Sequence, residues 1–140
     1  TPLLIKYPGE IEAGKVDNQS LVSSIDIMPT LLDLCDLEIP EDIDGNSFAP
    51  QCYRKENDQF NSVFSENYIG KMLRFDDYKY VKTKVDGEEY QILFDLKNDP
   101  GETENVFTEL GYEEVSKEAE AKLNKWLEEE NIDLRYDKQW

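Results

Sequence analysis

Histidine is absent from the 140 residues of this chain. Its absence excludes Ser-His-Asp and Cys-His nucleophilic catalysis and any histidine-ligated metal within the chain. It also removes the side chain that most often serves as a general base near neutral pH. Paired carboxylates are the remaining option, but 32 acidic residues offer so many pairs that no single pair is diagnostic.

Cysteines and glycine-rich motifs are also scarce. Cys35 and Cys52 have no histidine with which to complete a zinc site, and Cys35 is expected to be a buried free thiol. The chain has no glycine-rich phosphate loop and no Gly-x-Ser-x-Gly elbow. The acidic segment 42–46 (Asp-Ile-Asp-Gly-Asn) lacks the spacing of an EF-hand loop, so no metal site is expected in this chain.

Basic residues are outnumbered by acidic ones, 15 against 32, which leaves a net charge of −17. Binding of DNA or RNA is disfavoured, because a nucleic-acid-binding module needs a basic face to neutralise phosphates. The surplus of acid is expected to form a solvated surface rather than a binding tail. No apolar run approaches 18 residues, so no membrane-spanning helix is expected.

The first third of the chain predicts one strand and one helix. Residues 3–7 are mostly apolar and end at Pro8-Gly9, which favours a short strand. Residues 20–37 predict a helix in which Asp26 is the N-cap candidate and Pro29 occupies the third helical position, where a missing N–H is tolerated. The polar stretch after Pro50 marks the expected boundary, which divides the chain into domains 1–50 and 51–140.

The remainder predicts an antiparallel meander followed by a helix. Strands are expected at residues 62–68, 72–75, 78–84 and 90–96, joined by short turns that include Asp86-Gly87. In the third strand the pattern suggests one wet face, with Tyr78, Tyr80 and Val81 opposite Lys79, Lys82 and Lys84. A helix over residues 112–130 would cover one face of the sheet with an apolar stripe formed by Tyr112, Val115, Ala119, Leu123, Trp126 and Leu127.

The segment 95–106 (DLKNDPGETENV) closes the last expected strand. Pro100-Gly101 favours a tight turn, because proline fixes φ and glycine tolerates positive φ. Asp95, Asp99 and Asn105 are interpreted as turn and cap residues.

Arg74 is the cation that stands inside a predicted strand next to a turn. Two roles are open: contact with an anionic substrate at a cleft rim, or a surface ion pair. Tyr68 and Tyr80 could line such a rim, although packing in the core or at the sheet edge is the more ordinary role for both.

Several blocks of the chain, in order, resemble the sulfatase family. Residues 74–106 resemble its "R-x-x-x-x-K-Y … L-Y-D-L-x-x-D-P-x-E-x-x-N" close, with Phe94 where tyrosine is usual. Residues 1–9 (TPLLIKYPG) and 11–14 resemble its "x-P-L-I-V-x-x-P-G" strand and the "I-x-x-G" that follows. Residues 22–34 resemble its "V-S-x-x-D-x-x-P-T-L-L-D-L" helix, and residues 44–50 its "D-G-x-S-L-x-P" loop. One departure is Cys35-Asp36, where the family has a small residue and glycine.

The resemblance implies the C-terminal portion of a type-I, formylglycine-dependent sulfatase of the alkaline-phosphatase-like superfamily. The implied fold is α/β: a strand and helix left from the catalytic layer, then a four-stranded antiparallel sheet packed by a C-terminal helix (α+β within this piece). The implied parent hydrolyses sulfate esters of a small molecule or glycan, uses Ca²⁺ and a formylglycine, and is often periplasmic, lysosomal or secreted.

The resemblance places the catalytic groups upstream of this chain. Neither Cys35 nor Cys52 is followed by x-Pro-x-Arg, the context in which formylglycine forms. The start of the chain, directly in a strand-like segment, suggests a piece of a longer protein. The chain alone is therefore expected to be inactive, and its partner is the N-terminal catalytic part of the same protein.

Two alternatives remain open from the sequence. One is a related phosphonate or phosphodiester hydrolase, which shares much of the scaffold. The other is a stand-alone acidic interaction module. The module hypothesis predicts no large exposed apolar face, whereas a piece of a sulfatase should expose one where the missing part docks.

Overall fold

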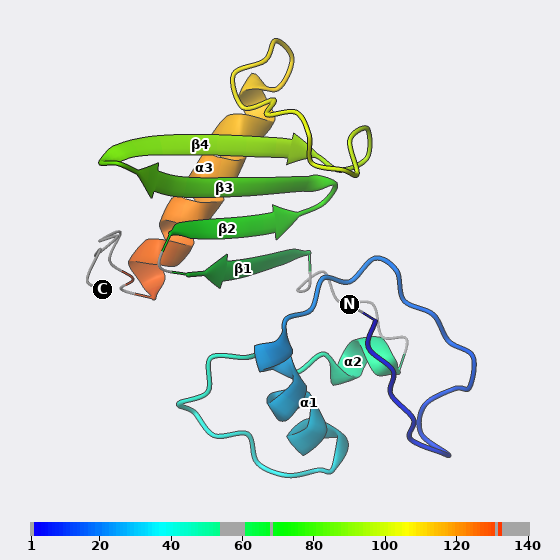
Figure 1. The fold of residues 1–140 in the computed structure, drawn as a ribbon. Helices are drawn as coiled ribbons and strands as arrows, with labels where there is room; N and C mark the ends of the chain where they lie inside the picture. The colour runs from blue at the N-terminus through cyan, green and yellow to red at the C-terminus, as the bar shows by residue number, and fades with distance from the viewer. Residues whose placement is uncertain (1, 54–60, 68, 131, 133–140) are drawn as a thin grey trace. The chain divides into compact units, whose positions relative to one another are not determined.

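The structure, a computed structural model, describes the chain except residues 1, 54–60, 68, 131 and 133–140. The chain forms two compact units, Thr1–Asn61 and Ser62–Trp140, and each is described by itself. Figure 1 labels the α-helices and the strands of both units. The expected domain boundary near residue 50 concerns the domains of the longer sulfatase and stays a prediction.

The first unit contains a short 3-10 helix η1 (Ser24–Asp26), α1 (Ile27–Leu34) and α2 (Ala49–Cys52). The strand predicted at residues 3–7 is wrong: among the described residues of this unit, none is in a strand. The physical reason is that an extended segment becomes a strand only beside a hydrogen-bonding neighbour, and residues 2–53 and 61 supply none.

The predicted helix 20–37 is shorter in the structure than expected. It ends in a Schellman motif, in which the Leu37 N–H donates to the Leu32 carbonyl (2.9 Å) and the Asp36 N–H to the Asp33 carbonyl (3.0 Å). Asp36 has φ 54°, the left-handed conformation that glycine usually supplies at this position. The departure from the family pattern at Cys35-Asp36 therefore leaves the helix end intact.

The prediction that Cys35 is buried is wrong, because Cys35 is an exposed free thiol. It lies on the same helix face as Ile27 and Leu31, and this whole face is exposed. The buried side of the helix is formed instead by Asp26, Pro29, Thr30 and Leu34.

The second unit is the predicted meander. Its strands are β1 (Ser62–Glu66), β2 (Gly70–Phe75), β3 (Tyr78–Val85) and β4 (Glu88–Asp95), all antiparallel in the order β1-β2-β3-β4. The turn between β3 and β4 has positive φ at both Asp86 (51°) and Gly87 (90°), which matches the twist of a tight hairpin.

Helix α3 (Glu113–Glu129) covers one face of the sheet, and Figure 1 shows it crossing behind the strands. The ring of Trp126 on this helix stacks on Phe64 of β1 at a centroid distance of 4.9 Å. The core between helix and sheet consists of Leu73, Phe75, Tyr80, Leu93, Ala119, Leu123 and Leu127. The mixed α and β architecture and the helical cover are therefore as predicted.

The predicted sides of β3 need a correction. Tyr80 lies in the core, and Lys82, two residues further on, lies on the same side with 9% of its surface exposed. Val81 lies on the opposite side with Lys79 and Thr83. The buried stem of Lys82 belongs to the helix-covered face, so the lysines of this strand do not form one wet face.

Candidate functional site

Asp26, expected as a helix N-cap, fastens two segments of the first unit. Its carboxylate accepts the Ser23 N–H (2.7 Å), as the third residue of a capping box does, and the Asn46 N–H (2.9 Å). It makes no side-chain cap to α1 itself. Asp26 therefore ties the loop around residue 46 to the start of the helix.

Thr30 and Gly45 hold the same loop. The Thr30 hydroxyl donates to the Asp26 carbonyl (2.6 Å) and accepts the Phe48 N–H (3.0 Å). A Cβ on Gly45 would lie 2.2 Å from the carbonyl oxygen of Ile25, so only glycine fits there. The two sequence blocks around residues 22–34 and 44–50 are thus joined by direct contacts.

Asp95 closes the end of β4, and only 5% of its surface is exposed. It accepts the backbone N–H groups of Lys97 and Asn98 (both 3.1 Å), the Asn98 side-chain amide (2.8 Å) and the Tyr112 hydroxyl (3.0 Å). Hydrogen bonding to Asn98 is the main cause that lowers the pKa of Asp95. This carboxylate therefore stays ionised and serves as an anchor between the sheet and the start of α3.

Asp99 and Asn105 organise the segment after β4. Asp99 accepts the N–H groups of Thr103 (2.6 Å) and Glu104 (2.9 Å), and the bond from Glu104 is the main cause of its lowered pKa. Asn105 accepts the Leu93 N–H (2.9 Å) and donates to the Gln91 carbonyl (3.1 Å). Asn105 therefore pairs with the outer edge of β4 as a neighbouring strand would, and protects that edge.

An ion pair joins the two parts of the sulfatase-like motif of residues 74–106, the strand β3 and the loop after β4. Lys79 Nζ lies 2.5 Å from Glu102 Oε2, and the ammonium lies 6.0 Å from the centroid of the Phe94 ring. Both Lys79 and Glu102 belong to the sulfatase-like motif of residues 74–106, but the motif did not predict that they form an ion pair. The regular spacing in the signature thus reflects a scaffold contact between β3 and the loop after β4.

Arg74, the predicted rim residue, holds the turn between β2 and β3. Its Nη1 donates to the carbonyls of Phe75 (3.0 Å), Asp76 and Tyr78 (3.1 Å). The expected surface ion pair is not among the contacts of the described residues. Tyr80, the other described rim candidate, is fully buried in the core, and Tyr68 lies outside the described residues.

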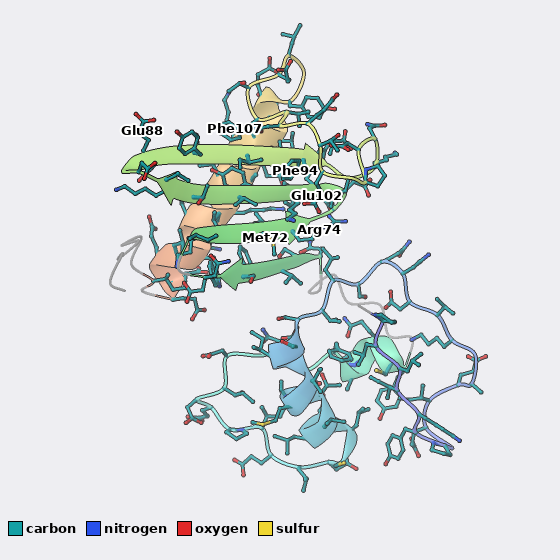
Figure 2. The ribbon with its side chains drawn as sticks, in the orientation of Figure 1. Met72, Arg74, Glu88, Phe94, Glu102 and Phe107 are labelled. Carbon is teal, nitrogen blue, oxygen red and sulfur yellow. The ribbon has the colours of Figure 1, made fainter. Side chains whose placement is uncertain are left out.

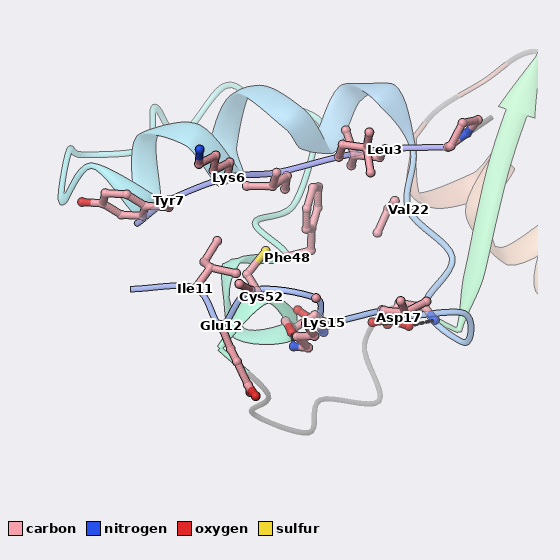
Figure 3. Close-up of a pocket in the computed structure, with 18 of the residues that line it drawn as sticks. Leu3, Lys6, Tyr7, Ile11, Glu12, Lys15, Asp17, Val22, Phe48 and Cys52 are labelled. Atoms are coloured by element: carbon pink, nitrogen blue, oxygen red, sulfur yellow. Dashed lines mark hydrogen bonds between the residues drawn. The ribbon is translucent and has the colours of Figure 1, made fainter. Parts of the chain in front are cut away.

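A pocket of about 960 Å³ lies within the first unit, lined chiefly by residues 2–22 together with Phe48, Gln51 and Cys52 (Figure 3). Of the two acids that line it, Glu12 and Asp17, the second is held by its own loop, since Asp17 accepts the N–H groups of Gln19 (2.9 Å) and Ser20 (3.0 Å). Burial raises the pKa of the Cys52 thiol, which keeps it protonated and a poor nucleophile. The pocket therefore presents apolar surface without an activated nucleophile.

The part of the chain that the structure describes contains no cluster of three or more His, Cys, Asp or Glu residues placed to hold a metal. No described helix is long and apolar enough to cross a membrane. The residues singled out by the motifs act on backbone groups and on each other. The geometry is that of a scaffold whose signature residues fix loops.

The family model for the C-terminal region of N-sulphoglucosamine sulphohydrolase matches residues 1–129. The chain belongs to this family. It is the C-terminal portion of a sulfatase with the alkaline-phosphatase-like fold.

Relatives agree with this assignment. The chain is 31% identical to the Delta 4,5-hexuronate-2-O-sulfatase of Bacteroides thetaiotaomicron, over 96% of this chain and 30% of that protein. Among solved structures, BT4656 in complex with its substrate D-glucosamine-2-N,6-O-disulfate aligns with a TM-score of 0.75 at 25% identity, over 96% of this chain and 29% of that one. This sulfatase region therefore spans less than a third of the length of each of these two proteins.

The phosphonate monoester hydrolase of Agrobacterium radiobacter is a more distant neighbour. It aligns with a TM-score of 0.58 at 22% identity, over 74% of this chain and 24% of that one. At that identity the likeness concerns the fold alone. The scaffold is thus common to both classes of hydrolase.

Proposed function

We propose that residues 1–140 are the C-terminal support of an enzyme that hydrolyses sulfate esters of a sugar. The observation that carries this proposal is the match of a sulfatase C-terminal family over residues 1–129. The hexuronate 2-O-sulfatase and the glucosamine disulfate complex of two relatives favour a sulfated saccharide as the substrate class.

The described residues do not fit the metal and the formylglycine that the family implies. Within the described ranges no carboxylate cluster is arranged for Ca²⁺, and neither cysteine has the x-Pro-x-Arg context. Both groups are therefore assigned to the upstream part of the enzyme, and no catalytic step is derived from this chain.

The partner proposed for the first unit is that upstream catalytic part. The support is the exposed apolar face of α1, where Ile27, Met28 and Leu31 are 37%, 54% and 53% exposed. A helix in a finished domain buries its apolar side, so this face favours a missing neighbour over a stand-alone acidic module.

Arg74 is retained as a proposed rim residue. Its Nη1 is engaged by the turn, and in the residues described no partner contacts its Nε or Nη2, which leaves one edge of the guanidinium for an anion. Arg74→Lys in the complete enzyme should raise KM for a sulfated saccharide more than it lowers kcat. An unchanged KM would assign Arg74 to the turn alone.

The main test compares two substrates and two proteins. The complete enzyme, purified with calcium, should release sulfate from a sulfated saccharide and leave a phosphonate monoester largely uncleaved. Residues 1–140 alone should give no turnover above buffer. Preferred cleavage of the phosphonate would favour the phosphonate hydrolase, and sulfate release by residues 1–140 would show that the active site has been misplaced.

A further inference from the structure

The face of the sheet opposite α3 is unusually apolar for a solvated surface. Alternation along β4 places Gln91, Leu93 and Asp95 toward the helix and Tyr90, Ile92 and Phe94 away from it. The outward residues of this strand are thus more apolar than the inward ones. An antiparallel sheet with one wet face shows the opposite pattern, polar side chains outward.

The strand register extends this pattern across the sheet. One outward row consists of Ser65, Met72, Val81 and Ile92, and the next row consists of Val63, Arg74, Lys79 and Phe94. We call these two rows, with Tyr90, the open face. In Figure 2, Met72, Arg74 and Phe94 mark the open face on the near side of the sheet.

No described helix or strand of the second unit packs on the open face. The one helix among the described residues of this unit, α3, contacts the other side through the core. The Lys79–Glu102 pair brings a loop to one end of the open face, while Met72, Val81 and Ile92 stay half-buried with no described helix or strand of this unit over them. A contiguous apolar patch of this kind in a highly charged chain marks a contact surface.

Charge argues against a second copy as the occupant. Two identical chains would bring together two molecules of net charge −17, and face-to-face pairing would set Arg74 and Lys79 near their own copies. A different segment carries no such penalty. The relatives supply one, because this chain matches only 30% of the hexuronate sulfatase and 29% of BT4656.

We propose that the open face is covered by the part of the sulfatase polypeptide that lies outside residues 1–140. The inference rests on the proposed function, since it needs the longer enzyme. The sheet then packs on both faces, with α3 on one and the catalytic part on the other. Arg74 and Lys79 lie at the border of this contact, beside the turn that Arg74 holds.

The test measures thiol accessibility in the complete enzyme. Val81→Cys is nearly isosteric and lies mid-row, whereas Leu110→Cys replaces an apolar residue that is 92% exposed in a loop of the same unit. Peptide-level mass spectrometry distinguishes the labelling of each new cysteine from that of Cys35 and Cys52. The thiol introduced by Val81→Cys should react with a maleimide at least about tenfold more slowly than the thiol introduced by Leu110→Cys. Ile92→Cys is the substitute if Val81→Cys fails to fold.

Residues 1–140 alone provide the reference state. There, Val81→Cys should lose most of its protection, because the covering segment is missing. Equal labelling of both sites in the complete enzyme would overturn the inference. Protection of this thiol that persists in residues 1–140 alone would also overturn the inference. It would mean that residues 1–61 cover the open face or, if the protection increases with protein concentration, that a second copy does.

A stability measurement gives an independent reading. Val81→Lys should lower the Tm of the complete enzyme by about 5 °C or more, because it buries an unpaired ammonium, while Leu110→Lys should leave it unchanged. Equal shifts would contradict the proposed cover. Sulfate release is assayed separately, so an enzyme with protected Val81 but no sulfatase activity would sink the proposed function and leave the interface standing.

Discussion

The described part of the second unit closes a core between its helix and sheet, whereas the described part of the first unit leaves most of its large apolar side chains exposed. In the second unit α3 closes on the sheet, and Leu73, Leu93 and Leu123 are fully buried. In the first unit the polar residues Asp26 and Thr30 share the buried side of the helix with Pro29 and Leu34, while Ile27, Met28 and Leu31 are exposed. The difference teaches that the second unit has a core of its own, while the first is held mainly by hydrogen-bonded loops, as expected if the proposed catalytic neighbour covers its apolar face.

The largest test of this contrast is a pair of leucine truncations in residues 1–140. Leu123→Ala opens a cavity in the core of the second unit and should cost about 3 kcal/mol of unfolding free energy. Leu31→Ala, on the exposed face of α1, should cost less than about 1 kcal/mol. Urea unfolding followed by tryptophan fluorescence, with circular dichroism for the helices, measures both. Similar costs for the two truncations would mean that the first unit also holds a closed core.

A glycine substitution tests how the first unit is held. Gly45→Ala would force a Cβ to within 2.2 Å of the Ile25 carbonyl, so the loop or η1 must move, at a cost of about 2 kcal/mol or more. Gly14→Ala, where φ is +77° but no atom lies within 4 Å, is the control and should cost about 1 kcal/mol.

Hydrogen exchange locates the damage from Gly45→Ala. Faster exchange should be confined to residues 24–48 and leave the sheet amides unchanged. Equal loss of protection in the sheet would mean that the two units unfold as one, which would break the comparison.

The sheet unit was predictable because its determinants are local. The strand positions, the Asp86-Gly87 turn and the three- and four-residue spacing of the α3 stripe each depend on a few neighbouring residues, and the structure agrees with them except for the sides assigned to Val81 and Lys82 in β3. The interpretation of Asp95 and Asp99 as turn and cap residues is confirmed, because both carboxylates accept hydrogen bonds mainly from residues that follow them by two to five positions.

What could not be predicted depends on distant partners. Residues 3–7 have strand composition but no neighbouring strand, and Cys35 has an apolar helical position on a face that nothing in the described first unit covers. The pairing of Lys79 with Glu102 spans 23 residues, and no spacing rule links them. The open face was missed for the same reason, since its pattern is visible only once the register sets four strands side by side.

Acid should weaken the second unit through Asp95. Its folded-state pKa is below the unfolded value of about 3.9, so its contribution is complete above that pH and is lost as pH falls through the folded-state pKa. Asp95→Asn should lower the Tm at pH 7. Both oxygens of Asp95 accept hydrogen bonds, and Oδ2 accepts from the Asn98 amide and the Tyr112 hydroxyl. An asparagine has only one side-chain oxygen, and its nitrogen cannot accept a hydrogen bond. The gap between variant and parent should narrow near pH 3. A constant gap across this range would show that the charge of Asp95 contributes nothing.

The smallest expected effect concerns two ion pairs of the second unit. Glu102→Gln removes the partner of Lys79, which fixes the loop after β4 to the sheet, and should cost about 1 kcal/mol. Glu129→Gln removes the exposed Lys125–Glu129 pair on α3 and should cost no more than about 0.5 kcal/mol. Both are measured by urea unfolding at low and high salt, which screens exposed pairs more strongly. Because Glu102 also borders the open face, Glu102→Gln should destabilise the complete enzyme more than it destabilises residues 1–140, while the effect of Glu129→Gln stays the same. Equal losses of stability from the two substitutions in the complete enzyme would place Glu102 outside the contact between the sheet and the catalytic part.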